Sequence, residues 1–292
     1  MALNRATLRT RSISAAIFVV IMLAGLFINQ WTFFILFSII HFGCWREYQE
    51  MIGLIDTRYK NISTFHRYGV MLAGWSLMLC LTNDDFHIGN FLLYPAGWRL
   101  GLFLVFLLPV SELVSTGTIS LKNIGYSLLG IIYISLSFGL LTGLLIIPSV
   151  SLHSTPVFPA LIIACMWIND TMAYIVGSLI GKTPLSIISP KKTWEGTAGG
   201  IILCVVVVSA LSRFIGVLKD FNVIHFVLIS LIAAVAGTFG DLLESKLKRL
   251  AGIKDSGSIL PGHGGFLDRF DSLIVATPFV WIYVAVFLKS GY

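Results

Sequence analysis

Residues 157–180 read VFPALIIACMWINDTMAYIVGSLI, an apolar run that contains one charged residue, Asp170. The run is long enough to cross a hydrocarbon core of about 30 Å as a helix. Similar runs recur along the 292 residues, of which 57% are hydrophobic and 12% are charged, and the mean hydropathy is +0.90. The sequence therefore predicts an all-α, polytopic integral membrane protein.

Nine apolar runs are candidate transmembrane helices, at 13–29, 31–45, 68–81, 100–114, 124–148, 157–180, 197–218, 223–243 and 273–288. The first follows a basic segment and resembles a signal sequence without a cleavage site, so we predict a retained anchor. We predict a single membrane domain over 1–292. Its N-terminal helices, 1–156, carry little motif content, and its catalytic half, 157–292, carries motifs at 169–196 and 241–272.

The distribution of Lys and Arg predicts a cytoplasmic N-terminus. With that orientation, only four of the 20 basic residues fall on or near the outer side, namely Arg99, Arg213, Lys219 and Lys289. The cytoplasmic loops account for the net charge of +6 and the pI near 9.2, which favour anionic membrane lipids as partners. No module that combines aromatic and basic residues is visible, so no nucleic acid is expected.

A charged, glycine-rich island interrupts the apolar pattern at 245–272, SKLKRLAGIKDSGSILPGHGGFLDRFDS. The simpler interpretation is a solvated, basic cytoplasmic loop. However, the glycines after Pro261 supply backbone N–H groups that can approach an anion, and Asp268 and Asp271 follow directly. Ionisable groups are costly near hydrocarbon, so the mixture indicates a functional site.

Two acids lie within or at the end of apolar spans in this half of the chain. Asp170 shares a helical face with Ala173, Tyr174, Gly177 and Gly181. The second acid, Asp241, shares a face with Gly237, Glu244, Ser245 and Lys248. The alternatives are a polar contact between helices for Asp170 and a helix-end ion pair for Asp241. Glu112 is a third such acid, which we interpret as structural packing.

A further motif, GKTPLSIISPKKTWEG, occupies 181–196. Pro190 breaks the chain after Ser189, and Lys191 and Lys192 then present adjacent ammonium groups that suit phosphate. A basic turn flanking a membrane is the alternative. The predicted topology places this loop and the island on one side. Carboxylates for a divalent cation and cations for phosphates then predict an active site at the cytoplasmic membrane face.

The island closely resembles the signature of phosphatidate cytidylyltransferases, also called CDP-diacylglycerol synthases. That signature runs S-x-apolar-K-R, then K-D, then P-G-H-G-G, then D-R-apolar-D. The segments SPKKTWEG at 189–196 and NDTMAYIVG at 169–177 also resemble stretches of that family, in the expected order. The resemblance covers 169–292, whereas the N-terminal half matches only in being polytopic. Met172 departs from the smaller or aromatic residue expected beside Asp170.

The resemblance implies transfer of CMP from CTP to phosphatidate in phospholipid biosynthesis, giving CDP-diacylglycerol and pyrophosphate. It implies a Mg2+-dependent enzyme, with room for a second, monovalent cation, as a multi-pass protein of a bacterial inner membrane; a homodimer is compatible with it. The expected metal ligands are Asp241, Asp268 and Asp170. The expected catalytic or substrate-binding residues are Lys191, Lys192, Lys248, Arg249, Lys254, Arg269, Ser189, His263, Gly264 and Gly265.

Three other functions fit parts of the pattern. A CTP-dependent lipid kinase of the polyprenol or dolichol type would share the membrane, the nucleotide and Mg2+. A transporter of an anionic solute would use acids in spans and basic loops, but it gives no reason for PGHGGFLDRFD. A non-catalytic scaffold for anionic lipids would require only the charge bias.

Overall fold

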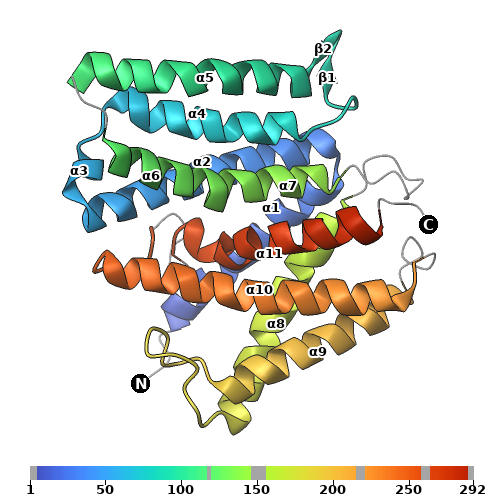
Figure 1. The fold of residues 1–292 in the computed structure, drawn as a ribbon. Coiled ribbons are helices and arrows are strands. Elements are labelled where there is room, and N and C mark those ends of the chain that lie inside the picture. Colours follow the sequence, from blue (N-terminus) through green and yellow to red (C-terminus); the bar gives the residue numbers. More distant parts are fainter. Residues whose placement is uncertain (1–4, 117–119, 146–155, 215–220, 258–263, 289–292) are drawn as a thin grey trace. The chain divides into compact units, whose positions relative to one another are not determined.

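The computed structural model describes residues 5–116, 120–145, 156–214, 221–257 and 264–288 (Figure 1). Within these ranges the regular structure is almost wholly helical, which confirms the all-α prediction. One exception is a hairpin of two-residue strands, β1 (His87–Ile88) and β2 (Phe91–Leu92), which pair antiparallel. Gly89 has φ +60° in its turn, a conformation that glycine adopts without strain.

The helices are numbered in chain order. They are α1 (Arg5–Phe27), α2 (Gln30–Ile55), α3 (Thr57–Lys60), α4 (Thr64–Cys80), α5 (Leu93–Thr116), α6 (Leu121–Gly130), a π-helical turn (Ile131–Leu136), α7 (Ser137–Gly143), α8 (Val157–Ile180), α9 (Trp194–Ser212), α10 (Val223–Leu250) and α11 (Leu267–Phe287).

Two compact units make up the chain. The first unit comprises Met1–Ile146, Ser154–Pro156 and Leu250–Phe270. The second comprises Ile147–His153, Val157–Arg249 and Asp271–Tyr292. The segment that follows α10 therefore belongs with the N-terminal helices. The predicted single membrane domain with a catalytic half at 157–292 stays a prediction.

Side-chain caps fix the starts of several helices. Asn29 accepts a hydrogen bond from the Thr32 backbone N–H at 2.8 Å, and the Thr32 hydroxyl accepts one from the Asn29 N–H at 3.2 Å, which completes a capping box on α2. Ser63 caps α4 and Thr193 caps α9 in the same way, each accepting from the backbone three residues on. These caps satisfy backbone donors that the helices leave unpaired.

In the first unit, α4 and α5 lie side by side and share a buried polar contact (Figure 1). His66 Nδ1 lies 3.0 Å from a carboxylate oxygen of Glu112, and both side chains are less than a tenth exposed. The other ring nitrogen of His66 lies 2.9 Å from the Ser127 hydroxyl. The pair supports the packing role predicted for Glu112, because each polar group has a partner within the helix bundle.

In the second unit, α8 and α9 pack closely along small residues. A Cβ added to Gly196 would lie 2.8 Å from the Ala173 carbonyl oxygen and 2.9 Å from the Gly177 Cα. Gly200 is equally crowded by the backbone of Asn169. The face predicted around Asp170 is therefore a helix-packing face, although Tyr174 is exposed.

The helices α10 and α11 also approach closely in the second unit (Figure 1). A Cβ on Gly240 would lie 2.5 Å from the Asp271 carbonyl oxygen, and one on Gly237 would crowd Met166 and Ser272. Glycine at position 240, one residue before Asp241, thus lets α11 lie directly against α10 at Asp271 and Ser272. This close approach gathers acids from both helices.

Within the described ranges, six helices are long and apolar enough to cross a membrane. They are Leu93–Val114, Leu121–Gly143, Val157–Ile180, Trp194–Ser212, Val223–Leu250 and Leu267–Phe287, and Ile13–Phe27 is a shorter apolar helix. The predicted span at 31–45 falls within α2 and the one at 68–81 falls in α4 except for its last residue; neither helix is among the six. The polytopic character is supported, and the count of nine stays a prediction.

Candidate active site

Three carboxylates converge in the second unit. Asp241 and Glu244 lie one turn apart near the end of α10, and Asp271 lies in the first turns of α11. One carboxylate oxygen from each lies within 4.8 Å of the others. Glu244 and Asp271 are buried, and the Asp241 side chain is 23% exposed. Like charges this close raise each other's energy, so the arrangement requires cations nearby.

Two lysines partly neutralise the acidic cluster of Asp241, Glu244 and Asp271. The Lys192 ammonium pairs with Asp241, and the Lys248 ammonium lies 2.5 Å from Glu244, one helical turn away. Burial lowers the pKa of Lys192 below its ordinary value, while the Asp170 and Asp271 carboxylates act in the opposite direction. Of the predicted phosphate ligands, the structure thus places Lys192 beside the predicted ligand Asp241 and Lys248 beside Glu244.

The turn that carries Lys192 is held by the start of α9. The Glu195 carboxylate accepts hydrogen bonds from the backbone N–H groups of Lys182 and Thr183, at 3.1 Å and 3.2 Å. The Leu185 N–H donates to the Lys192 carbonyl at 2.7 Å, and the Lys192 N–H donates to the Ser189 carbonyl at 3.1 Å. The motif at 181–196 is therefore a folded turn, within which Lys191 points to solvent and Lys192 is half-buried.

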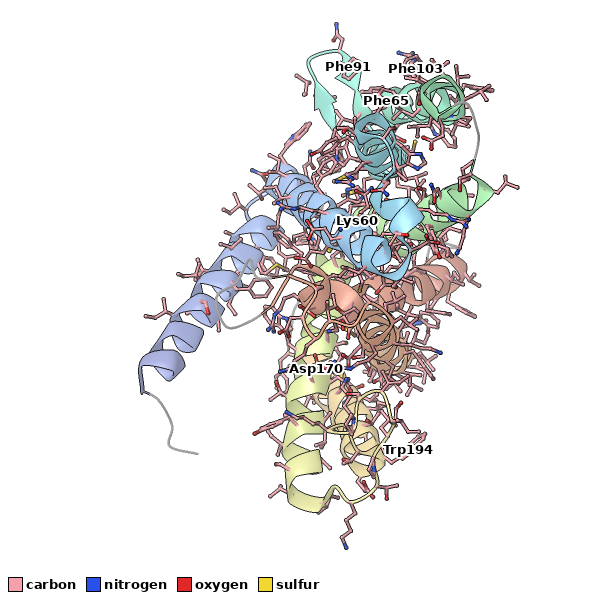
Figure 2. The ribbon with its side chains drawn as sticks, turned by 90° about the vertical axis from the view of Figure 1, so that its left-hand side faces the viewer. Lys60, Phe65, Phe91, Phe103, Asp170 and Trp194 are labelled. Carbon is pink, nitrogen blue, oxygen red and sulfur yellow. The ribbon has the colours of Figure 1, made fainter. Side chains whose placement is uncertain are left out.

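Asp170 is exposed on α8, and Trp194 marks the start of the neighbouring helix α9 (Figure 2). The Asp170 carboxylate is close enough to act electrostatically on the Lys192 ammonium. It is not among the three acids of the cluster. The structure therefore associates Asp170 with the lysine that reaches Asp241.

Asp268 belongs to the first unit and binds the glycine-rich segment of the island. One of its carboxylate oxygens accepts hydrogen bonds from the backbone N–H groups of Ser256 and Gly265, both at 2.9 Å. Gly264 has φ +84°, and a Cβ there would also meet the Asp268 carboxylate. These glycines let the loop before α11 fold around an acid in the first turn of that helix. The two units are described separately, so the shared ion predicted for Asp268 and Asp241 stays a prediction.

A second acid, Glu47 on α2, anchors the same segment. Its carboxylate accepts hydrogen bonds from the Ser256 hydroxyl at 2.7 Å and from the backbone N–H groups of Phe266 and Leu267, both at 2.8 Å. Glu47 is 4% exposed, and a Cβ on Gly257 or Gly265 would overlap its carboxylate. Two of its donors open α11, where a negative charge is favoured by the helix dipole.

The remaining predicted residues are on the surface or outside the described ranges. Lys254 and Arg269 are exposed in the first unit, and Arg249 is exposed at the end of α10 in the second. Ser189 is half-buried in the turn before Lys191. His263 lies outside the described residues. The structure thus brings Asp241 together with Lys192 and brings Asp268 together with Gly264 and Gly265.

The sequence gives no ligand or catalytic role to Glu244, Asp271 or Glu47, although Asp271 lies in the island predicted as a functional site. Glu244 is three residues after Asp241, a spacing that shares a helical face, so its signal was present. Asp271 is the last acid of D-R-F-D, and the sequence does not distinguish it as a ligand from Asp268 beside it. Glu47 carries no local signal, because its partners lie 209 to 220 residues further along the chain.

The donor set of the acidic cluster fits a hard divalent cation. Mg2+ prefers oxygen ligands and is usually held by one or two carboxylates together with substrate phosphates. Three carboxylates within 4.8 Å offer that chemistry, and adjacent lysines offer point charges for phosphates. The cluster can therefore hold a cation next to an anionic, phosphorylated substrate.

Comparisons with known proteins agree on one family. The model of the cytidylyltransferase family matches residues 9–287. A phosphatidate cytidylyltransferase of Bacillus subtilis is 39% identical over 190 residues, 65% of this chain and 68% of that protein. One from Staphylococcus saprophyticus is 40% identical over 59% of this chain and 64% of its own length. A chloroplastic one from Arabidopsis thaliana is 43% identical over 41% of this chain and 30% of its own. The chain belongs to the cytidylyltransferase family.

Proposed function

We propose that the chain is a phosphatidate cytidylyltransferase, which transfers CMP from CTP to phosphatidate. The family match over 9–287 carries this proposal, and the names of the relatives specify the lipid acceptor. The island at 245–272, which holds the signature sequence, supports it from the chain's own residues. The products are CDP-diacylglycerol and pyrophosphate.

The reaction needs alignment and charge neutralisation more than it needs a strong base. Phosphatidate is already ionised, so a phosphate oxygen attacks the α-phosphorus of CTP, and the bond from that phosphorus to the oxygen bridging to the β-phosphate breaks. The leaving pyrophosphate carries away that oxygen and its electron pair. Lys192 and Lys248 are placed to hold phosphate oxygens, because their ammonium groups lie at the acidic cluster.

Mg2+ dependence is part of the proposal. Asp241, Glu244 and Asp271 would hold the ion, which supplies Lewis-acid and templating chemistry when bound. Asp268 and Asp170 remain ligand candidates on the sequence alone. The close approach of three carboxylates, two of them buried, supports this assignment, because two lysines supply less positive charge than the three acids carry.

The membrane arrangement proposed is nine spans with a cytoplasmic N-terminus and active site, in a bacterial inner membrane. The six apolar helices support a multi-pass protein. The bias of Lys and Arg supports the orientation. CTP is water-soluble and made inside cells, so a site at the cytoplasmic face would meet both substrates.

The decisive experiment is to incubate the purified protein with CTP, phosphatidate and Mg2+ and to identify the products. We expect CDP-diacylglycerol and pyrophosphate in equal amounts. A polyprenol-type kinase would instead release CDP and yield a phosphorylated lipid. Release of CDP without CDP-diacylglycerol would overturn the proposal in favour of that kinase.

A further inference from the structure

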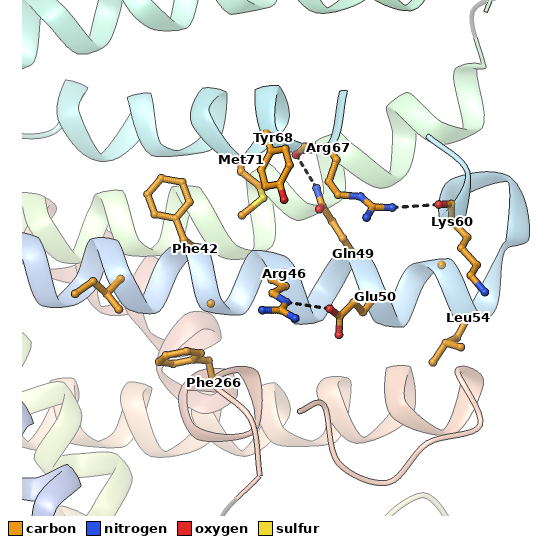
Figure 3. Close-up of a pocket in the computed structure, with 13 residues that line it drawn as sticks. Phe42, Arg46, Gln49, Glu50, Leu54, Lys60, Arg67, Tyr68, Met71 and Phe266 are labelled. Atoms are coloured by element: carbon orange, nitrogen blue, oxygen red, sulfur yellow. Dashed lines mark hydrogen bonds and ion pairs between the residues drawn. The ribbon is translucent and has the colours of Figure 1, made fainter. Parts of the chain in front are cut away.

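A groove on the first unit combines an apolar surface with a group of cations (Figure 3). Its volume is about 970 Å³, and α2, the α3–α4 region and Phe266 line it. Phe42, Met71 and Phe266 supply apolar surface toward one end, and Lys60 and Arg67 lie toward the other. This size suits a small-molecule ligand. The gradient from apolar to charged suits an amphiphile.

The charged part of the groove has an excess of positive groups. Arg46, Lys60 and Arg67 line it together with one acid, Glu50. Arg46 Nε lies 3.0 Å from Glu50 Oε1, but the two side chains are 76% and 60% exposed, so this pair contributes little and a ligand can displace it. Among the described residues, no carboxylate pairs with Lys60 or Arg67.

Backbone contacts hold one of these cations, Arg67, in place. The Arg67 guanidinium donates to the Lys60 carbonyl at 3.1 Å, and the Gln49 side-chain amide donates to the Arg67 carbonyl at 3.0 Å. These bonds tie α2, the end of α3 and the start of α4 together at the groove (Figure 3). The Arg67 guanidinium is therefore held beside the Lys60 backbone, which lowers the ordering cost of binding an anion at this cation.

The apolar part of the groove is built on the signature segment. A Cβ on Gly43 would overlap the Phe266 ring, so glycine at this position of α2 seats that aromatic side chain. The backbone N–H of Phe266 is bound by Glu47, one turn along the same helix. One wall of the groove is thus fixed by the segment that precedes Asp268.

We propose that this groove binds phosphatidate, with an acyl chain along Phe42, Met71 and Phe266 and the phosphate among Arg46, Lys60 and Arg67. The assignment rests on the proposed function, which requires a lipid phosphomonoester. A phosphomonoester suits the patch better than a phosphodiester, because it carries more charge and has three terminal oxygens that guanidinium groups bind in pairs. An uncharged lipid would leave the cations without a counter-ion.

The test is labelling by a phosphatidate that carries a photoactivatable acyl chain, without CTP, on protein in phosphatidylcholine nanodiscs. We expect labelled peptides from α2, α4 and the Phe266 segment. Arg46→Gln and Arg67→Gln should each lower the labelling roughly 10-fold, the effect of one lost charge-assisted contact. Glu50→Gln should raise it about 2-fold, because Arg46 loses its competing partner. All three side chains are exposed, so the variants should fold.

Arg99→Gln is the matched control, because Arg99 is an exposed cation on α5 that does not line the groove. Its labelling should equal that of the wild type. The groove assignment would be overturned if photoactivatable phosphatidylcholine labelled the protein as strongly as phosphatidate does. It would also be overturned if Arg46→Gln and Arg67→Gln left the labelling unchanged.

Turnover separates this assignment from the proposed function. The wild-type protein could make CDP-diacylglycerol while the variants of the groove cations are labelled as strongly as the wild type. That result would overturn the groove assignment and support the proposed function. Charge-dependent labelling by a protein that makes no CDP-diacylglycerol would support the groove and overturn the function.

Discussion

Carboxylates serve the two units in opposite ways. In the first unit, Glu47 and Asp268 accept hydrogen bonds from backbone N–H groups of the loop that they hold. In the second unit, Asp241, Glu244 and Asp271 face one another and are matched with the side chains of Lys192 and Lys248. The backbone N–H groups are fixed by the fold and stay bound to their carboxylates. The lysine ammonium groups sit on flexible side chains, so they can exchange a carboxylate for a phosphate when a substrate binds. The first arrangement is an anchor and the second is suited to chemistry.

The largest expected effect is on the acidic cluster as a whole. Removing divalent cations with EDTA should abolish formation of CDP-diacylglycerol, and added Mg2+ should restore it, because three close carboxylates need a cation to bring phosphates near. The measurement is product formation before and after chelation. Full activity in a metal-free preparation would show that lysines alone neutralise the cluster.

The next largest effect should come from replacing a single acid of the cluster. Asp241→Asn and Asp271→Asn preserve size and remove a negative ligand, so each should lower kcat/KM by about 1,000-fold. The double variant should be little worse than either, because groups that serve one ion fail as a unit. Losses that simply multiply would argue that the two acids act separately.

The same design tests Asp268, for which the sequence alone predicts a shared ion with Asp241. That hypothesis predicts non-additive losses for Asp241→Asn and Asp268→Asn and a raised Mg2+ requirement in both single variants. If the losses multiply and Asp268→Asn leaves the Mg2+ requirement unchanged, Asp268 is a loop anchor and not a ligand. Circular dichroism and thermal unfolding of each variant control for folding.

Replacing Glu47, which anchors the loop before α11, should lower the stability of the fold more than it changes the metal site. Glu47→Ala leaves three donors without their acceptor, two of them buried, which should lower the free energy of unfolding by about 3–5 kcal/mol. Thermal unfolding measures this. Glu50→Ala is the matched control, since Glu50 is exposed on the same helix, and its effect should stay within about 0.5 kcal/mol.

Glu47→Gln keeps the shape of the side chain and one acceptor oxygen, so it should fold and lose roughly 10-fold in kcat/KM. Its apparent affinity for Mg2+ should stay unchanged, whereas that of Asp271→Asn should fall. A shift in the Mg2+ requirement of Glu47→Gln would contradict the separation between anchor and cluster.

The sequence predicted the helical class and the family because apolar length and a long linear motif are local properties. It predicted Asp241 and Lys192, which lie within motifs. It could not assign Glu47, whose partners fold back from more than 200 residues away. The glycines of the island were interpreted as an approach to phosphate, yet Gly265 also makes room for Glu47, which only three-dimensional packing reveals.

The last comparison concerns the two adjacent lysines, which the sequence treats alike and the structure separates. Lys191 points to solvent, whereas Lys192 is half-buried against Asp241. Lys192→Ala should lower kcat/KM by roughly 10-fold to 100-fold, the effect of one charge-assisted contact, and Lys191→Ala by only a few-fold. Steady-state kinetics, normalised to the amount of folded protein, measures both effects. Equal losses would indicate that the two lysines act only as a basic turn that flanks the membrane.

The pH profile sharpens this difference between the lysines. Burial lowers the pKa of Lys192, so its ammonium loses its proton at a lower pH than an ordinary lysine would, and the contribution of its charge is present below that pKa and lost above it. We expect activity to fall on the alkaline side, and Lys192→Arg, which stays charged, to move that fall to higher pH. Lys191→Arg should leave the profile in place. An alkaline limb that is identical in Lys192→Arg and the wild type would show that another group titrates there, and the position of Lys192 beside Asp241 would then serve packing alone.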